Sequence, residues 1–209
     1  MIKVCISDNH PVVIQGIKSY FSGNSQMEIV ATGTTFEELQ SALQSKKIDI
    51  AIIDLELEGI TSIRDIKNLI KDHNETKFVL FTAVSEKMYA PTAIKAGVSA
   101  YIQKNTSLKA LEDTLNKVQQ GIVVFSDDVK KNIELLSKGK KADRLYKKLS
   151  TREIEVLRYL NDGKKNKEIA EILSLDEKTI STYKLRLLAK LNVTNLVDLL
   201  SKAKSLDII

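Results

Sequence analysis

Residues Ile48–Leu55 read IDIAIIDL, and this stretch decides the fold. Its apolar run has the length of a strand that is buried on both faces of a parallel sheet, and it leads into an acidic residue, Asp54. The sequence on both sides alternates short apolar runs with segments of helical spacing. The N-terminal part of the chain therefore predicts an α/β fold, a doubly wound parallel sheet with helices on both faces.

The alternation gives five expected strands, each followed by an expected helix. The strands are expected at Ile2–Ser7, Met27–Gly33, Ile48–Leu55, Lys77–Thr82 and Ser99–Gln103. The helices are expected at Pro11–Phe21, Phe36–Gln44, Ile63–Ile70, Ser85–Ala96 and Thr106–Gln119. In sheets of this kind, the working site lies at the carboxyl ends of the strands.

The alternation stops after about residue 120. Residues 122–148 are rich in lysine and predict a basic linker, with a short helix expected at Val129–Leu136. The remaining sequence predicts four short helices, the first of which begins with a capping box formed by Ser150 and Glu153. The other three are expected at Asn166–Leu173, Asp176–Leu191 and Asn195–Lys204. We therefore expect one domain over residues 1–121, a linker over 122–148 and a small all-α domain over 149–209.

Composition narrows the class of protein. Of 209 residues, 43% are hydrophobic and 28% are charged, which is typical of a globular chain. The net charge of +5 comes from the C-terminal portion, because residues 1–122 carry 13 basic and 14 acidic side chains. This excess favours an anionic partner such as nucleic acid. The single cysteine, Cys5, excludes an internal disulfide and a paired-cysteine zinc or redox motif.

The chain has no apolar run long enough to span a bilayer. An acidic residue, Asp8, follows the start too closely for a signal peptide. We therefore expect no membrane association and a cytoplasmic location.

Polar side chains follow four of the expected strands. Asp8 and Asn9 follow the first strand, Asp54 lies at the end of the third, Thr82 ends the fourth and Lys104 follows the fifth. Parallel strands bring these residues to one edge of the sheet. Carboxylates bind Mg²⁺ and can attack phosphorus, while a hydroxyl and an ammonium group can hold phosphoryl oxygens. The pattern predicts a site at which a carboxylate becomes phosphorylated.

Residues 1–120 resemble the receiver domain of two-component response regulators. Asp8, Asp54, Thr82 and Lys104 match the acidic residue, the phosphoacceptor, the switch hydroxyl and the lysine of that family, and Tyr101 matches its switch aromatic residue. The resemblance implies a flavodoxin-like five-stranded sheet. It also implies that a sensor histidine kinase phosphorylates Asp54 in the presence of Mg²⁺. The implied metal ligands are Asp8, Asn9, Asp54 and the backbone carbonyl of Glu56.

The chain departs from the family pattern at three places, which keeps open the first of two alternatives. Asn9 replaces a second acid, Leu57-Glu58-Gly59 replaces Met-Pro-Gly, and Asn105 replaces the proline after Lys104. The first alternative is a pseudo-receiver that regulates transcription without phosphorylation. The second is an enzyme such as an aspartyl-phosphate phosphatase, because Asp54 lies at the end of a Rossmann-like strand. Glu56 disfavours this alternative, since that class has a second aspartate at its position. His10 is expected to be a loop residue beside Pro11.

The segment Asp176–Leu191 reads DEKTISTYKLRLLAKL and carries the second set of candidate residues. Helical spacing places Ile180, Leu187 and Leu191 on an inward face. The opposite face is small, polar and basic, which suits a helix that enters the major groove of DNA. The preceding segment, Asn166–Leu173, would position that helix.

Residues 149–205 resemble the LuxR-type helix-turn-helix module, through the segments 149–157, 166–170, 178–184 and 190–191. A receiver domain joined to this module is the layout of NarL-type response regulators. The resemblance implies a transcription factor that dimerises and binds double-stranded promoter DNA. The expected DNA contacts are Lys178, Thr179, Ser181, Thr182, Lys184, Leu185 and Arg186. The expected dimer contacts are Leu196, Val197, Leu199 and Leu200, with packing inside their own bundle as the alternative.

Overall fold

The computed structural model describes residues 1–127, 129, 149–206 and 208–209. It divides into two compact units. One unit holds Met1–Glu86 and Ala93–Ser126, and the other holds Lys87–Thr92 and Asp127–Ile209. The expected helix at Val129–Leu136 and most of the expected linker lie outside the described residues. None of the described helices is long and apolar enough to cross a membrane.

The first unit is built on a five-stranded parallel sheet with the order β2-β1-β3-β4-β5. The strands are β1 (Ile2–Ser7), β2 (Met27–Gly33), β3 (Ile50–Ile53), β4 (Lys77–Thr82) and β5 (Ala100–Gln103). This order is that of flavodoxin-like folds and confirms the predicted fold class. The chain reverses its direction of winding between β1 and β3, so the crevice at their carboxyl ends is where such folds place a site.

Helices alternate with these strands along the chain. They are α1 (Pro11–Phe21), α2 (Phe36–Ser45), α3 (Ile63–Asp72), α4 (Glu86–Ala96) and α5 (Leu108–Gln119). Side-chain caps fix three of the helix starts. The hydroxyls of Thr35 and Ser107 accept hydrogen bonds from the first turns of α2 and α5, and Ser62 forms a capping box with Asp65 at α3.

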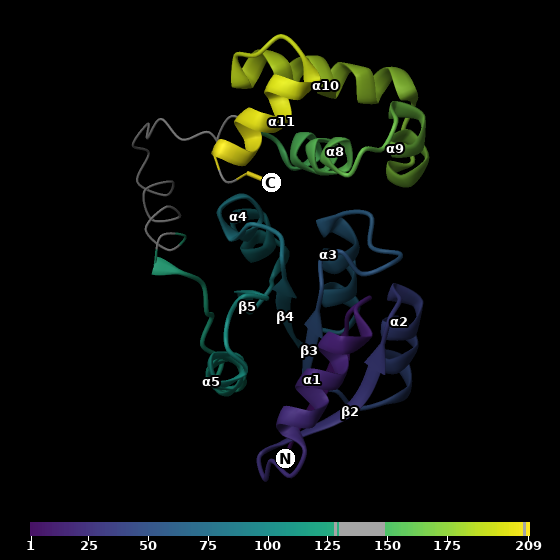
Figure 1. Cartoon of the computed structure of the whole chain (residues 1–209). Helices are drawn as coiled ribbons and strands as arrows, with labels where there is room; N and C mark the ends of the chain where they lie inside the picture. Colours follow the sequence, from purple (N-terminus) through teal and green to yellow (C-terminus); the bar gives the residue numbers. More distant parts are fainter. Residues whose placement is uncertain (128, 130–148, 207) are drawn as a thin grey trace. The chain divides into compact units, whose positions relative to one another are not determined.

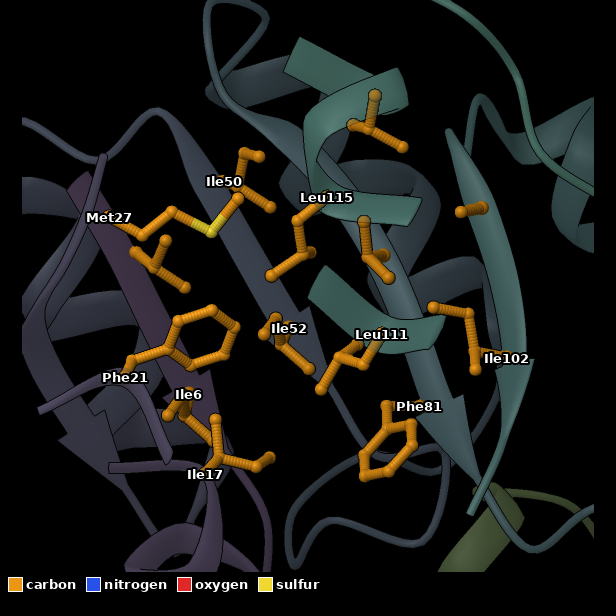
Figure 2. Close-up of a cluster of buried hydrophobic side chains, with 14 of the residues drawn as sticks. Ile6, Ile17, Phe21, Met27, Ile50, Ile52, Phe81, Ile102, Leu111 and Leu115 are labelled. Carbon is orange, nitrogen blue, oxygen red and sulfur yellow. The ribbon is translucent and has the colours of Figure 1, made fainter. Parts of the chain in front are cut away.

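The core between the sheet and helices α1 and α5 is continuous and apolar (Figure 2). Ile6 of β1 and Ile52 of β3 face Ile17 of α1 and Leu111 of α5. Cys5 lies between Val4 and Ile6 of this core, so strand alternation points its side chain to the other face of the sheet. Helices α2 and α3 lie on that other face (Figure 1). Burial raises the pKa of the Cys5 thiol to about 11, which fits a small core residue rather than a reactive thiol.

Strand β3 is shorter than the predicted Ile48–Leu55. Ladder pairing covers only Ile50–Ile53, which lie opposite Val4–Ser7 of β1 and Lys77–Leu80 of β4. Ile48 and Leu55 are nonetheless buried, with 5% and 2% of their surface exposed. The apolar run therefore marks the length of the buried segment, which exceeds the paired strand at both ends.

The chain continues along the sheet after α5. Val124 forms a parallel bridge with Ala100, and its carbonyl accepts a 3.2 Å hydrogen bond from the Tyr101 amide. Phe125 is buried. The first unit therefore extends to Ser126, past the domain end that was expected at residue 121.

The second unit contains four helices after the undescribed segment. They are α8 (Thr151–Asn161), α9 (Asn166–Leu173), α10 (Glu177–Leu191) and α11 (Leu196–Ser205). The predicted capping box of Ser150 and Glu153 is present at α8, and Glu153 also accepts a 2.8 Å hydrogen bond from Lys190 of α10. Ser174 ends α9 in a left-handed conformation, which turns the chain toward α10. The predicted inward residues Ile180, Leu187 and Leu191 are buried.

Candidate phosphoacceptor site and nucleic-acid interface

The first unit gathers the predicted polar residues at one edge of the sheet. Asp8 and Asp54 follow β1 and β3, the two strands that flank the reversal in winding, and they are only 2% and 1% exposed. Thr82, the last residue of β4, is fully buried. Ordinary strand geometry places them, because each residue ends or follows a strand whose register is fixed by its neighbours.

Lys104 joins the two carboxylates. Its ammonium nitrogen lies 2.8 Å from Asp8 Oδ2 and 2.5 Å from Asp54 Oδ2. The lysine is held there because its backbone amide donates to the carbonyl of Thr82 at 3.0 Å, one strand away. Burial lowers the pKa of Lys104, but Asp54 and Asp8 raise it more, so the ammonium stays charged. One positive charge therefore compensates two buried carboxylates.

Asn9 and Glu56 also meet at this edge. The side-chain amide of Asn9 donates to the Glu56 carbonyl at 3.2 Å, and the Glu56 amide donates to Asp54 Oδ1 at 3.1 Å. The backbone of Glu56 is thus tied to both Asn9 and the candidate phosphoacceptor. These are two of the expected metal ligands, placed side by side.

His10 is a member of the site that the sequence reasoning treated as a loop residue. Its Nδ1 atom lies 3.0 Å from Asp8 Oδ1 and 3.4 Å from Lys104 Nζ. The His10 amide donates to the same Asp8 oxygen at 2.9 Å. The signal in the sequence was the position of His10, two residues after the acid and directly before Pro11, which fixes where α1 begins.

Thr82 and Tyr101 meet at one residue of the β4–α4 loop. The Val84 amide donates to Thr82 Oγ1 at 3.3 Å, and the Tyr101 hydroxyl donates to the Val84 carbonyl at 2.9 Å. Tyr101 is buried, with 4% of its surface exposed. A movement of the Thr82 hydroxyl would therefore change the position of Val84 and, with it, the hydrogen bond of Tyr101.

The donor set fits a divalent cation beside a nucleophilic carboxylate. One ligand atom each of Asp8, His10 and Asp54 lies within 4.8 Å of the others. The two carboxylates offer hard oxygens, and the Glu56 carbonyl lies next to Asn9. Chemically, the site can hold a cation, present the Asp54 carboxylate to phosphorus and neutralise the product with Lys104.

In the second unit, α10 exposes the polar face that the sequence predicts. Lys178, Thr182, Leu185 and Arg186 are exposed, and Leu185 is 67% exposed. Thr182 donates its hydroxyl to the Lys178 carbonyl at 2.9 Å, which leaves the methyl group and the oxygen lone pairs to meet a partner. Thr179 and Lys184 are half-buried at the borders of this face.

Ser181 lies between α10 and α9 rather than on the open face. Its hydroxyl accepts a 3.1 Å hydrogen bond from the side-chain amide of Asn166, the first residue of α9. The residue is half-buried. This bond ties the two helices of the helix-turn-helix together, a role that helical spacing alone did not indicate.

Helix α11 corrects one expected dimer contact. Leu199 is fully buried and α11 packs against α10 and α8, so Leu199 belongs to the interior, as the alternative prediction held. Val197 is 73% exposed, and Leu196 and Leu200 are half-buried. Val197 is therefore the most accessible of the four candidates.

Comparison with protein families assigns both units. Residues 4–116 match the response regulator receiver domain, and residues 147–203 match the bacterial regulatory proteins of the luxR family. The Fimbriae Z protein of Salmonella typhimurium is 31% identical over 206 residues, covering 99% of this chain and 98% of that protein. Response regulator protein VraR of Staphylococcus aureus is 33% identical over 192 residues, covering 92% and 91%.

Solved structures include one that matches almost the whole of this chain. RcsB from Salmonella enterica serovar Typhimurium, bound to promoter rprA in the presence of the phosphomimetic BeF₃⁻, is 25% identical to this chain. The match has a TM-score of 0.78 and covers 98% of this chain and 100% of RcsB.

Proposed function

Because this chain belongs to the response regulators that join a receiver domain to a LuxR-type DNA-binding domain, we propose that phosphorylation of Asp54 controls its binding to promoter DNA. A sensor histidine kinase supplies the phosphoryl group. Membership of this family also decides against the phosphatase that the sequence left open. The proposed regions are the receiver over residues 1–121, the linker over 122–148, whose first residues up to Ser126 pack with the receiver, and the DNA-binding region over 149–209.

One observation carries the proposal. Asp54 is 1% exposed, yet one of its oxygens accepts from the Glu56 amide and the other contacts Lys104. Burying two carboxylates that share one lysine costs free energy, and arrangements of this kind cluster at functional sites. Its place at the reversal in winding is where this fold puts its chemistry.

The proposed reaction is transfer of a phosphoryl group to a carboxylate. An Asp54 oxygen attacks phosphorus, the bond between phosphorus and the kinase histidine nitrogen breaks, and that nitrogen leaves with the electron pair. A divalent cation, for which we propose Mg²⁺, would be held by Asp8, Asn9, Asp54 and the Glu56 carbonyl and would neutralise phosphoryl oxygens. After the transfer, the Lys104 ammonium would bind a phosphoryl oxygen in place of the Asp54 carboxylate oxygen.

The signal then passes through Thr82. A phosphoryl group on Asp54 attracts the Thr82 hydroxyl, which in this structure accepts a hydrogen bond from the Val84 amide. Moving that hydroxyl breaks the hydrogen bond that the Val84 amide donates. Val84 is then still bound at its carbonyl by the Tyr101 hydroxyl. The β4–α4 loop and Tyr101 thus form the element that has two arrangements.

The output is a homodimer on double-stranded promoter DNA. Lys178, Thr182, Leu185 and Arg186 lie on the open face of α10, and Thr179 and Lys184 flank it. Two such helices, placed about one helical turn apart, would read two half-sites. Val197 is the proposed centre of the contact between DNA-binding domains. RcsB was solved on promoter DNA with a phosphomimetic, which supports this assignment. A regulator of promoters works beside the chromosome, so we place it in the cytoplasm.

The test is DNA binding with and without phosphorylation. A duplex enriched from a randomised pool on the chain treated with acetyl phosphate serves as the probe, and fluorescence anisotropy gives its Kd. The proposal expects acetyl phosphate to tighten binding for the wild type and to leave Asp54→Asn unchanged. An equal decrease of Kd in both proteins would show that phosphorylation of Asp54 does not control DNA binding.

The pseudo-receiver remains as a second candidate because of Asn9. Its amide donates to the Glu56 carbonyl, which a cation would otherwise use. In this account the receiver holds a fixed arrangement and DNA binding ignores acetyl phosphate. The same titration separates the two candidates, since only the first expects a change in Kd.

A further inference from the structure

The open face of α10 carries a hydroxyl and a large apolar side chain among its cations. Thr182 lies at the middle of this face, because Lys178 and Arg186 are one helical turn before and after it. Leu185 lies on the same face and is 67% exposed. In the major groove of DNA, each base pair presents its own set of donors, acceptors and methyl groups. The chemistry of Thr182 and Leu185 therefore bears on which base pair this helix reads.

A hydrogen bond inside α10 makes Thr182 an acceptor. Its hydroxyl donates to the Lys178 carbonyl at 2.9 Å, so the hydrogen is already used within the helix. The oxygen lone pairs stay available, because the side chain is exposed. The groups of the major groove that donate to an oxygen are the amino groups of adenine and cytosine. Thr182 therefore favours adenine or cytosine over guanine or thymine, which present acceptors there.

Leu185 has no hydrogen-bonding group in its side chain, so its favourable contacts are apolar. The apolar group that base edges present in the major groove is the methyl group of thymine. Against cytosine or guanine, the leucine side chain would shield amino or carbonyl groups from water without bonding to them, which costs free energy. Leu185 therefore favours thymine.

The two side chains are close enough to read one base pair. Residues three apart on a helix are neighbours on its surface, with about 5–6 Å between their Cβ atoms. Along the helix axis they are about 4.5 Å apart, against about 3.4 Å between successive base pairs. An A·T pair carries both favoured groups, the amino group of adenine and the methyl group of thymine. A G·C pair offers an amino group on cytosine but no methyl group.

The cations of this face are less suited to guanine, the base that arginine and lysine read most often. The Arg186 guanidinium lies over the ring of Tyr183, 5.9 Å from the ring centroid, and this contact keeps it beside its own helix. Lys178 lies in the first turn of α10, and its flexible ammonium group suits a phosphate. We infer that α10 reads an A·T base pair, with Thr182 accepting a hydrogen bond from the adenine amino group and Leu185 contacting the thymine methyl group.

The inference rests on the DNA binding of the proposed function, but the two can fail separately. The proposed function is tested by the change of Kd that acetyl phosphate causes. The inference is tested by comparing duplexes at one state of phosphorylation. A response to acetyl phosphate without the A·T contact would retain the proposed function and overturn this inference. The A·T contact in a protein that ignores acetyl phosphate would do the reverse.

The experiment uses the full chain treated with acetyl phosphate and the duplex enriched from a randomised pool, with Kd measured by fluorescence anisotropy. Each thymine is replaced in turn by uracil, which removes only the methyl group. We expect one position in each half-site where uracil weakens binding of the wild type by about threefold or more and leaves Leu185→Ala unchanged. A cytosine at that position should bind the wild type more tightly when it carries a 5-methyl group, and Leu185→Ala should not distinguish the two forms.

The contact of Thr182 is tested by replacing each adenine in turn with purine, which lacks the amino group. Thr182→Val keeps the shape of the side chain and loses the oxygen, whereas Thr182→Ser keeps the oxygen and loses the methyl group. At one position, purine should weaken binding of the wild type and Thr182→Ser by about threefold or more and leave Thr182→Val unchanged. A general weakening of the duplex by purine would affect all three proteins alike.

Two results would overturn the inference. One is a half-site in which no uracil substitution distinguishes the wild type from Leu185→Ala. The other is a half-site in which no purine substitution distinguishes Thr182→Ser from Thr182→Val. A 5-methyl group on cytosine that tightens binding of Leu185→Ala as much as that of the wild type would also contradict the assigned role of Leu185.

Discussion

Replacing Lys104 by methionine tests the electrostatics of the site most sharply. Methionine keeps much of the length of the side chain and removes its charge. Asp8 and Asp54 then face each other as two buried carboxylates whose nearest ligand atoms lie within 4.8 Å. At an effective dielectric constant of about 20, two unit charges at that separation repel each other by about 3.5 kcal/mol.

We therefore expect Lys104→Met to lower the free energy of unfolding of the receiver by about 3 kcal/mol in metal-free buffer. This agrees with the roughly 3–5 kcal/mol found when one partner of a buried ion pair is removed. The aspartates raise the pKa of Lys104 despite its burial. Its contribution is therefore complete below the ordinary lysine pKa, about 10.4, and is lost only as pH rises through the higher pKa of the folded state. Measurements near pH 7.5 capture all of it.

A divalent cation should reverse the loss. In the wild type, the cation must compete with the Lys104 ammonium for oxygens of Asp8 and Asp54. In Lys104→Met it finds both carboxylates uncompensated. We expect the concentration of Mg²⁺ at half-saturation to fall by about tenfold or more, and the stability gained at a given Mg²⁺ concentration to be larger by on the order of 1–2 kcal/mol.

Hydrogen exchange measured by mass spectrometry suits this test because the chain has two units. Peptides from β1 and β3 report the receiver, and peptides from α10 serve as an internal reference that should not change. Lys109→Met is the matched control, because that lysine is 66% exposed and its ion pairs contribute little. Unchanged protection of β1 and β3 in Lys104→Met without metal would refute the reasoning. So would an equal Mg²⁺ response in variant and wild type.

Three further predictions concern Asn9 and the DNA-binding unit. Asn9→Asp should lower the Mg²⁺ concentration needed for half-maximal phosphorylation, because a carboxylate replaces an amide that now donates to the Glu56 carbonyl, and intact-mass titration checks this. Burial raises the pKa of Glu153, but the hydrogen bonds from Lys190 and Ser150 lower it by more, so the net pKa lies below the ordinary glutamate value. Glu153 therefore stabilises the folded unit above the ordinary glutamate pKa, and this stabilisation is lost as pH falls through the folded-state value. Glu153→Gln should cost about 1 kcal/mol at pH 7 and flatten this acid dependence in hydrogen exchange of α8 and α10; a wild-type pH profile would count against it. Thr182→Ala should weaken binding to the selected duplex by about 1–3 kcal/mol and leave random DNA unaffected, and an equal loss on both would make Thr182 a backbone contact.

Much of the fold followed from periodicity. Strand β1 and helix α1 have the predicted bounds, because burial on both faces of a strand and on one face of a helix leaves different spacings in the sequence. The ends of β3 did not follow, since hydrophobicity reports burial and Ile48 is buried without belonging to the paired ladder. The ends of a paired strand depend on the adjacent strands of the sheet, and the local sequence does not specify these.

The candidate site shows the same division. The convergence of Asp8, Asp54, Thr82 and Lys104 was predictable, because parallel topology places the ends of strands together. The contact of His10 with Asp8 was not, because it depends on the direction of one side chain at a helix start. The meeting of the strand ends at one edge could be inferred, but a rotamer could not.

The DNA-binding unit gives a comparable case. Helical spacing placed Ser181 on the outer face, whereas its hydroxyl accepts from Asn166 of α9. A side chain at the border of a helix face can point to solvent or to a neighbouring helix. The hydrogen-bond partners that the neighbouring helix offers determine which of the two it does. Leu199 is buried for the same kind of reason, since packing of α11 on α10 and α8 could not be read from α11 alone.

Intact mass spectrometry of the full chain tests the central claim, that Asp54 is the phosphoacceptor, most directly. Wild type and Asp54→Asn are treated with acetyl phosphate, with and without a divalent cation, and their masses are compared. The account predicts one added phosphoryl group on the wild type, only when the cation is present, and none on Asp54→Asn. Equal labelling of the two proteins, or no labelling of the wild type under any condition, would contradict it.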